Sequence, residues 1–225
     1  VLRGFSTVED GNTVNIGLLR IAGLTVPRNP DGSPPQPEQV SLDVLQMSNL
    51  QVTGTTTLTL ASLELGGWAA GKPTRFVMEG LQTAQPGAGM VDGVRLARLA
   101  MQGMDAPRIL GAVIRGERVP SLVGQSSLDM RGLELTGAGQ PVGGIAEMQM
   151  AANITAEDGS GSGTFAARGI RVEPLPMIAP WLTRFGYQGI EGEISAATVH
   201  DASSGRIEVN DLTIAARQAG TLTFS

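Results

Sequence analysis

The sequence contains no cysteine, which excludes disulfide bonds, thiolate metal sites and a cysteine nucleophile. Aromatic residues make up only 4% of the 225 residues, so any core must be filled by aliphatic side chains and methionine. Charged residues are also scarce, at 16% against the usual share of about a quarter. Because disordered chains have the opposite bias, a low charge with an apolar fraction of 41% indicates a folded protein.

Clustered cations and long apolar runs are missing as well. Lysine and arginine number 16 against 21 acidic residues, and no stretch of the chain gathers them. Nucleic-acid binders need clustered cations to displace counterions from phosphates, so the composition argues against a nucleic-acid partner. No apolar run reaches the ~20 residues that a membrane-spanning helix requires. We therefore expect no transmembrane segment in this chain.

Glycine, in contrast, is abundant, with 31 residues or roughly twice the usual share. Glycine destabilises helices and is favoured where the chain turns with positive φ, so this abundance predicts many short strands. The length suits one large all-β domain, which we expect to span residues 1–225 as a fragment of a longer or processed chain. Residues 27–37 are rich in proline and are expected to form an exposed loop, because proline lacks the N–H that a sheet interior needs.

A short phrase recurs along the chain, in which a small or turn-prone residue precedes an apolar, a variable and a second apolar residue. It occurs at 23–26, 49–52, 62–65, 93–96, 132–135, 169–172 and 211–214. Alternation with a period of two buries one face of a strand, and the irregular spacing excludes a strict solenoid repeat. Turn-forming residues at 157–163 and 201–205 indicate hairpins. We predict a mainly β fold, an antiparallel meander in one long twisted or curved sheet whose strands all turn the same face inward.

Two segments depart from the strand pattern and predict short helices. Residues 105–116 begin with an aspartate and an early proline, end at glycine, and place Ile109 and Val113 on one helical stripe. Residues 174–186 place Ile178, Trp181, Leu182 and Phe185 on another, although Pro180 lies inside this segment. We expect both helices to cover the buried face of the sheet as plugs or lids.

Few residues suit acid–base catalysis. His200, the only histidine, adjoins Asp201 and would suit a general base held by a carboxylate, but it also fits a simple turn residue at the end of a strand. Glu191 and Glu193 would share one face of a strand, as paired catalytic carboxylates do, and alternating carboxylates are equally typical of a solvated face. We retain these four residues as the candidates for an enzyme, and we expect the protein to be non-catalytic.

The sequence shows no clear pattern for a cofactor site or a metal site either. The glycine-rich stretch 159–163 leads into a strand and lacks the lysine and following helix of a phosphate-binding loop. Met148 and Met150 have no histidine or cysteine beside them to complete a copper site, and methionine is the usual adaptable filler of apolar surfaces. We predict no cofactor and no metal.

Three segments resemble a group of uncharacterised proteobacterial cell-envelope proteins: Gly66–Arg75, Phe185–Tyr187 and Asp211–Phe224. The resemblance is most continuous in the C-terminal part of the chain, and the looser strand phrase extends it over most of the sequence. The group is loosely similar to AsmA-like and YdgA-like envelope proteins, whose long twisted sheets form apolar grooves. The resemblance implies a periplasmic location and contact with lipid, and it carries over no catalytic residue.

These observations predict an envelope domain that binds or carries lipid or another amphiphile in an apolar groove. The residues expected to line the groove are Ile109, Val113, Met148, Met150, Ile178, Trp181, Leu182 and Phe185. A structural scaffold or protein-interaction module in an envelope complex remains the alternative. An open apolar trough would favour the first hypothesis, and a solid packed core the second.

Overall fold

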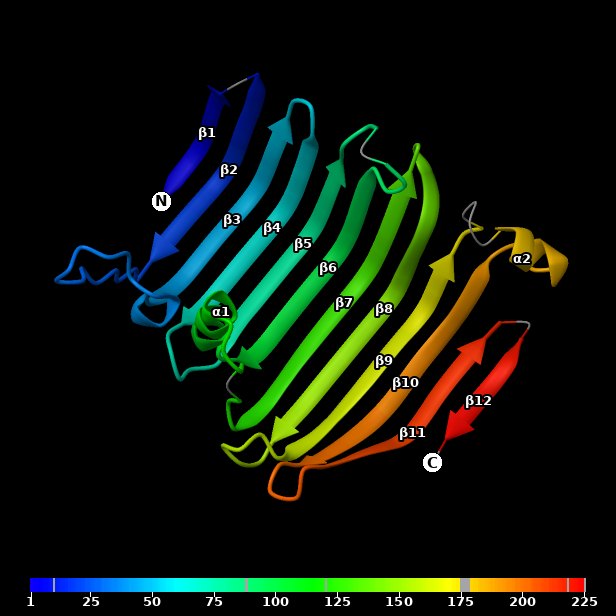
Figure 1. Ribbon diagram of the computed structural model, residues 1–225. Helices are drawn as coiled ribbons and strands as arrows, with labels where there is room; N and C mark the ends of the chain where they lie inside the picture. The colour runs from blue at the N-terminus through cyan, green and yellow to red at the C-terminus, as the bar shows by residue number, and fades with distance from the viewer. Residues whose placement is uncertain (10, 88, 120, 175–178, 218, 225) are drawn as a thin grey trace.

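The computed structural model describes residues 1–9, 11–87, 89–119, 121–174, 179–217 and 219–224. Twelve strands form one antiparallel sheet in which spatial order follows chain order and which is not closed, so the predicted meander is confirmed (Figure 1). The strands are β1 (Leu2–Glu9), β2 (Asn12–Ala22), β3 (Leu42–Thr53), β4 (Thr57–Trp68), β5 (Thr74–Ala84), β6 (Gly93–Met104), β7 (Gly124–Gly137), β8 (Gln140–Ile154), β9 (Gly161–Val172), β10 (Ile190–Asp201), β11 (Arg206–Ala216) and β12 (Gly220–Phe224).

Most connections follow the predicted turn chemistry. The 157–163 and 201–205 segments join β8 to β9 and β10 to β11 as hairpins. The proline-rich residues 27–37 lie in the exposed connection between β2 and β3, which ends in the short 3₁₀ helix η1 (Pro37–Gln39). The prediction of a strand at 23–26 is wrong, because only Thr25 forms an isolated bridge, to Ser41. Pro27 follows at once and lacks the N–H with which a strand would continue.

The first predicted helix is confirmed as α1 (Ala106–Arg115). The Asp105 carboxylate accepts a hydrogen bond from the Arg108 N–H at 3.3 Å, and Gly116 ends the helix in the left-handed conformation. The second helix, α2 (Ala179–Arg184), is shorter than predicted. Pro180 stands in its first turn, where a missing N–H removes no helical hydrogen bond. Residues 175–178 lie outside the described residues.

A line of left-handed residues, which we call the crease, crosses the sheet from β1 to β9, and neighbouring strands approach closely along it between β2 and β3, β4 and β5, β6 and β7, and β8 and β9. Every second strand has one left-handed residue there: Gly4, Asn49, Gly80, Gly132 and Gly169. The strand between carries a residue with little or no side chain: Gly17, Ala61, Ala97 and Ala146. A Cβ placed on Gly132 would lie 2.8 Å from the Ala97 Cβ, so the approach excludes one of the two side chains. Three copies of the recurring sequence phrase begin with a left-handed residue of the crease, namely Asn49, Gly132 and Gly169.

The sheet forms a single open layer. The chain exposes 13994 Å², whereas a compact monomer of 23.3 kDa would expose about 9,700 Å². Among the described residues the buried apolar side chains are Leu42, Leu60, Leu96, Ala112, Met130 and Ala167. Since domains are normally built from two packed layers, one face of this sheet lacks the layer that would complete a core. The described part of the chain therefore has an open sheet rather than the solid packed core that would favour the scaffold hypothesis.

Candidate functional site

The main candidate surface is a pair of adjacent apolar rows that run across the strands, which we call the apolar band. The first row has one apolar residue from every strand, each paired with the next: Leu2, Leu19, Met47, Leu63, Met78, Leu99, Met130, Met148, Ala167, Ile194, Ile214 and Leu222. Twelve strands spaced ~4.8 Å apart make this row about 50 Å long. No polar residue interrupts it.

The second row lies two residues further along each strand and therefore on the same face. Its paired members, from β2 to β10, are Ile21, Leu45, Leu65, Phe76, Met101, Leu128, Met150, Phe165 and Ala196. The two rows together contain Met47, Met78, Met101, Met130, Met148 and Met150, most of the nine methionines in the chain. Methionine is unbranched and polarizable, so the band is a pliable apolar surface.

Exposure of the band is greatest toward the two edges of the sheet. Leu2 in β1 and Leu222 in β12 are exposed, whereas Met130 and Ala167 at the centre are buried by their neighbours. Met150 in the second row remains 45% exposed although it lies in a central strand. Apolar surface is thus open to a partner toward both edges of the sheet and at Met150, and it is covered at the centre of the first row.

Directly behind the apolar band, on the opposite face, a row of charged residues crosses the central strands. This row pairs Glu79, Arg98, Arg131, Glu147 and Arg168 on β5 to β9. Arg98 and Arg131 stand directly opposite each other, an arrangement that is unfavourable for like charges. Each is compensated by a carboxylate: Arg98 by Glu79, and Arg131 by Asp129 at 3.0 Å. These ion pairs distinguish the charged row from the apolar band.

The residues predicted to line one groove are not brought together. Met148 and Met150 lie in the apolar band, in the middle of β8. Ile109 and Val113 belong to α1, which follows β6 at one end of the strands. Trp181, Leu182 and Phe185 lie in or just after α2, at the opposite end (Figure 1). Ile178 is outside the described residues.

The helices also do not cover the middle of the sheet as the predicted lids would. In α1 the buried residues are Pro107, Gly111 and Ala112, and a Cβ on Gly111 would overlap the carboxylate of Glu38 in η1. The predicted apolar stripe faces outward instead, with Val113 61% exposed. The small side of the helix is buried because only a helix surface without bulky side chains fits against Glu38 and its loop.

The four candidates for catalysis lie on one strand, β10, and in the turn that follows it. Glu191 is near the start of β10 and pairs with Arg217 at 2.6 Å, whereas His200 and Asp201 end the strand about 30 Å away. His200 Nδ1 donates to the Gly159 carbonyl oxygen at 3.1 Å. The hydroxyls of Ser203 and Ser204 lower the pKa of Asp201 to about 2, as a turn-capping carboxylate requires. The four residues do not converge in one cleft.

Metal ligands and membrane-spanning helices were sought over the described residues. No group of three or more histidine, aspartate or glutamate side chains in that part of the chain is arranged to hold a metal ion. No helix within the same residues is long and apolar enough to cross a bilayer.

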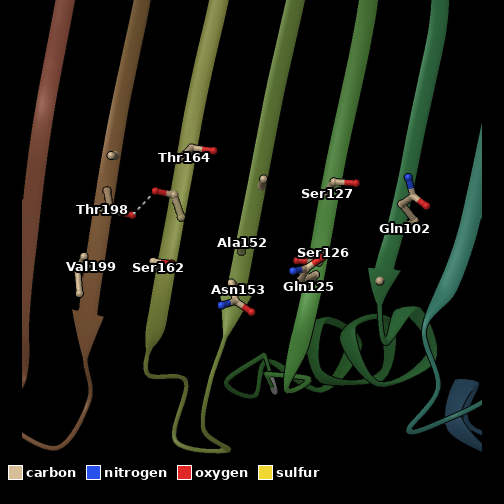
Figure 2. Close-up of a pocket in the computed structure, with 14 residues that line it drawn as sticks. Gln102, Gln125, Ser126, Ser127, Ala152, Asn153, Ser162, Thr164, Thr198 and Val199 are labelled. Atoms are coloured by element: carbon tan, nitrogen blue, oxygen red, sulfur yellow. Dashed lines mark hydrogen bonds between the residues drawn. The ribbon is translucent and has the colours of Figure 1, made fainter.

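A shallow trough of about 770 Å³ lies over β6 to β10, near the end of the strands where α1 is found (Figure 2). Its lining carries no charge. Ser127 and Thr164 directly precede the band residues Leu128 and Phe165, so they point to the opposite face. Thr198 donates to the Gly163 carbonyl oxygen at 3.5 Å. Sequence reasoning missed this trough, since strands far apart in the chain supply its small polar residues.

No protein-family model, curated protein or solved structure matches this chain.

Proposed function

We propose that this chain is a non-catalytic domain of the bacterial cell envelope that binds or carries lipid or another amphiphile along the apolar band. The observation that carries the proposal is the uninterrupted first row, with one apolar residue on each of twelve paired strands. A ligand lying across the strands meets only hydrocarbon and thioether groups, whatever its position. Burial of that surface contributes about 25 cal/mol per Å².

The polarity of the two faces supports an amphiphile rather than a small polar ligand. The band offers no charge, and the ion-paired row lies on the other side of the sheet. An acyl chain spans about 15 Å, half of the hydrocarbon core of a bilayer, so the ~50 Å band has room for more than one chain. Methionine side chains adapt to chains of different length and unsaturation.

The periplasmic location rests on the resemblance of Gly66–Arg75 and Asp211–Phe224 to envelope proteins, and the absence of cysteine is compatible with it. Fractionation of a bacterium that expresses the full-length gene product tests the location. Recovery in the cytoplasmic fraction would contradict it.

Titration of the delipidated protein with a fluorescent fatty acid tests the binding proposal. We expect saturable uptake, and we expect Met148→Lys to weaken it about tenfold or more, because a charge in the first row must be desolvated by the ligand. Gln149→Lys is the matched control, since it adds the same charge at the next residue of β8, on the opposite face. Equal uptake by the two variants, or no uptake by the folded protein, would overturn the proposal.

The alternative is a scaffold in an envelope complex, in which a second protein layer covers the same band. The single open layer favours it, because domains are normally built from two packed layers and the described residues supply only one sheet. Crosslinking in native membranes, followed by size-exclusion chromatography, would recover such a partner. A stable complex that abolishes fatty-acid uptake would favour the scaffold.

A further inference from the structure

The short helix α2 presents aromatic side chains to solvent. Trp181 is 63% exposed and Phe185 is 67% exposed, and their spacing of four residues places them on the same side of the helix. The chain has only two tryptophans, one tyrosine and five phenylalanines, and Trp181, Phe185 and Tyr187 fall within seven residues. In a protein this poor in aromatic residues, such a group outside any core indicates a contact surface.

The segment 179–190, which contains α2, carries one positive charge although the chain as a whole has a net charge of −5. Residues 179–190 include Arg184 and no acidic residue. Arg171, next to last in β9, lines a cavity of about 410 Å³ at this end of the sheet together with Glu173, Glu191 and Arg217, so the cavity lining as a whole has no net charge. Within the described residues neither Arg171 nor Arg184 forms an ion pair, whereas Arg217 in the same cavity is paired with Glu191. The Arg184 guanidinium is therefore free to meet an anion, whereas Arg171 has the Glu173 carboxylate in the same cavity.

We infer that α2 docks on the headgroup layer of an anionic lipid bilayer, with Trp181 and Phe185 inserted at the interface and Arg184 facing lipid phosphates. Tryptophan prefers the membrane–water interface because its ring is apolar and its N–H is polar. Arginine beside apolar side chains on a short helix is typical of segments that lie in that interface. The inference does not depend on ligand binding by the apolar band.

The other helix lacks this combination. On α1 the exposed apolar residues are aliphatic, including Val113 and Ile114. Its cations are already neutralised: Arg115 pairs with Glu38 at 2.7 Å and with Glu117 at 2.9 Å. Arg108 lies 3.4 Å from the Asp105 carboxylate. Substitutions at Val113 and Ile114 therefore provide a matched control with similar exposure at the opposite end of the strands.

Sedimentation with phosphatidylcholine vesicles that contain phosphatidylglycerol tests the inference on the unmodified chain. We expect binding that weakens when phosphatidylglycerol is omitted or salt is raised. The double substitution Trp181→Ala, Phe185→Ala should weaken binding about tenfold. Val113→Ala, Ile114→Ala should leave it unchanged. Equal binding by the two double variants would overturn the inference and assign vesicle contact to another surface.

Fluorescence locates the contact directly. In a Trp68→Phe background Trp181 is the only tryptophan, and its emission should shift to the blue on the same vesicles and be quenched by brominated acyl chains. Unchanged emission under conditions where the protein sediments would exclude insertion of α2. If Trp68→Phe does not fold, the sedimentation comparison decides.

Failure of this inference is distinguishable from failure of the proposed function. Trp181→Ala, Phe185→Ala should retain fatty-acid uptake, because both residues lie outside the apolar band. Met148→Lys should retain vesicle sedimentation, because Met148 lies in the middle of β8 and not in α2.

Discussion

In two strand pairs along the crease the strands approach each other to a similar distance, but the glycine that permits the approach lies on opposite members of the two pairs. Between β6 and β7 the left-handed residue is Gly132, and Ala97 has the methyl group that fills the contact. Between β2 and β3 the left-handed residue is Asn49, which has a side chain, and it faces Gly17, which has none. A Cβ on either glycine would lie 2.8 or 3.0 Å from the partner's Cβ. The constraint therefore acts on the pair, and either member can satisfy it.

The largest expected effect is that of Gly132→Ala. The new methyl group meets Ala97 Cβ at 2.8 Å and places a non-glycine residue at φ +62°, so we expect a loss of about 2–4 kcal/mol in the free energy of unfolding. Urea denaturation measures it. Gly139→Ala is the control, because Gly139 has φ +73° but open space around it, and should lose about 1 kcal/mol. Equal losses would show that the contact with Ala97 is unimportant.

Moving the glycine from position 132 to position 97 should recover much of the stability that is lost when position 132 alone gains a side chain. Gly132→Asn combined with Ala97→Gly reproduces the Asn49–Gly17 pair in β6 and β7, and asparagine tolerates the left-handed conformation. We expect a coupling energy of about 1–2 kcal/mol in the double-mutant cycle, measured by urea denaturation of the four proteins. Strictly additive losses would contradict a pairwise constraint.

Gly17→Ala should have a smaller effect than Gly132→Ala. Its Cβ would lie 3.0 Å from the Asn49 Cβ, and Gly17 is not in the left-handed region, so only the contact is disturbed. We expect thermal unfolding to show a loss of about 1 kcal/mol. Asn49→Gly in the same protein should relieve it. A loss as large as that of Gly132→Ala would mean that the two sites differ in more than the left-handed backbone.

The smallest effect is expected outside the crease, at the 201–205 turn. Hydrogen bonds from Ser203 and Ser204 lower the pKa of Asp201 from 3.8 to about 2 in the folded protein. The turn is therefore stabilised at pH values above 3.8, and this contribution is lost as the pH falls toward 2. Because Asp201 is fully exposed, Asp201→Asn should flatten the acid limb of stability against pH only slightly. A large change would imply a role for Asp201 beyond the turn.

The fold was largely predictable from the sequence, because its signals are local. Alternating residues such as Leu133, Glu134 and Leu135 specify a strand with two unlike faces, and Asp105 and Gly116 mark the two ends of α1. Turn residues at 157–163 and 201–205 specify hairpins, hence the meander. The strand predicted at 23–26 failed where proline removed a needed donor.

The candidate site was predictable only in part. Met148 and Met150 belong to the apolar band, but sequence periodicity does not show that Met148 stands beside Met130 and Ala167. That pairing depends on register between strands that are each specified separately. The sequence also did not predict the orientation of α1. An apolar stripe shows which residues share one side of a helix, but it does not show which side packs against the rest of the chain. The small residues of α1 are buried because Glu38 comes from a distant loop.

The sequence alone determined that this protein is a chain of short two-faced strands without the groups needed for thiol or multi-histidine metal chemistry, since alternation and composition are properties of neighbouring residues. Only the tertiary structure decided that the apolar residues of twelve strands align into one band on an open sheet, and that two short helices lie at opposite ends of it. Alignment across strands is set by hydrogen-bond register and by the crease, where residues far apart in sequence approach too closely for both to have a side chain.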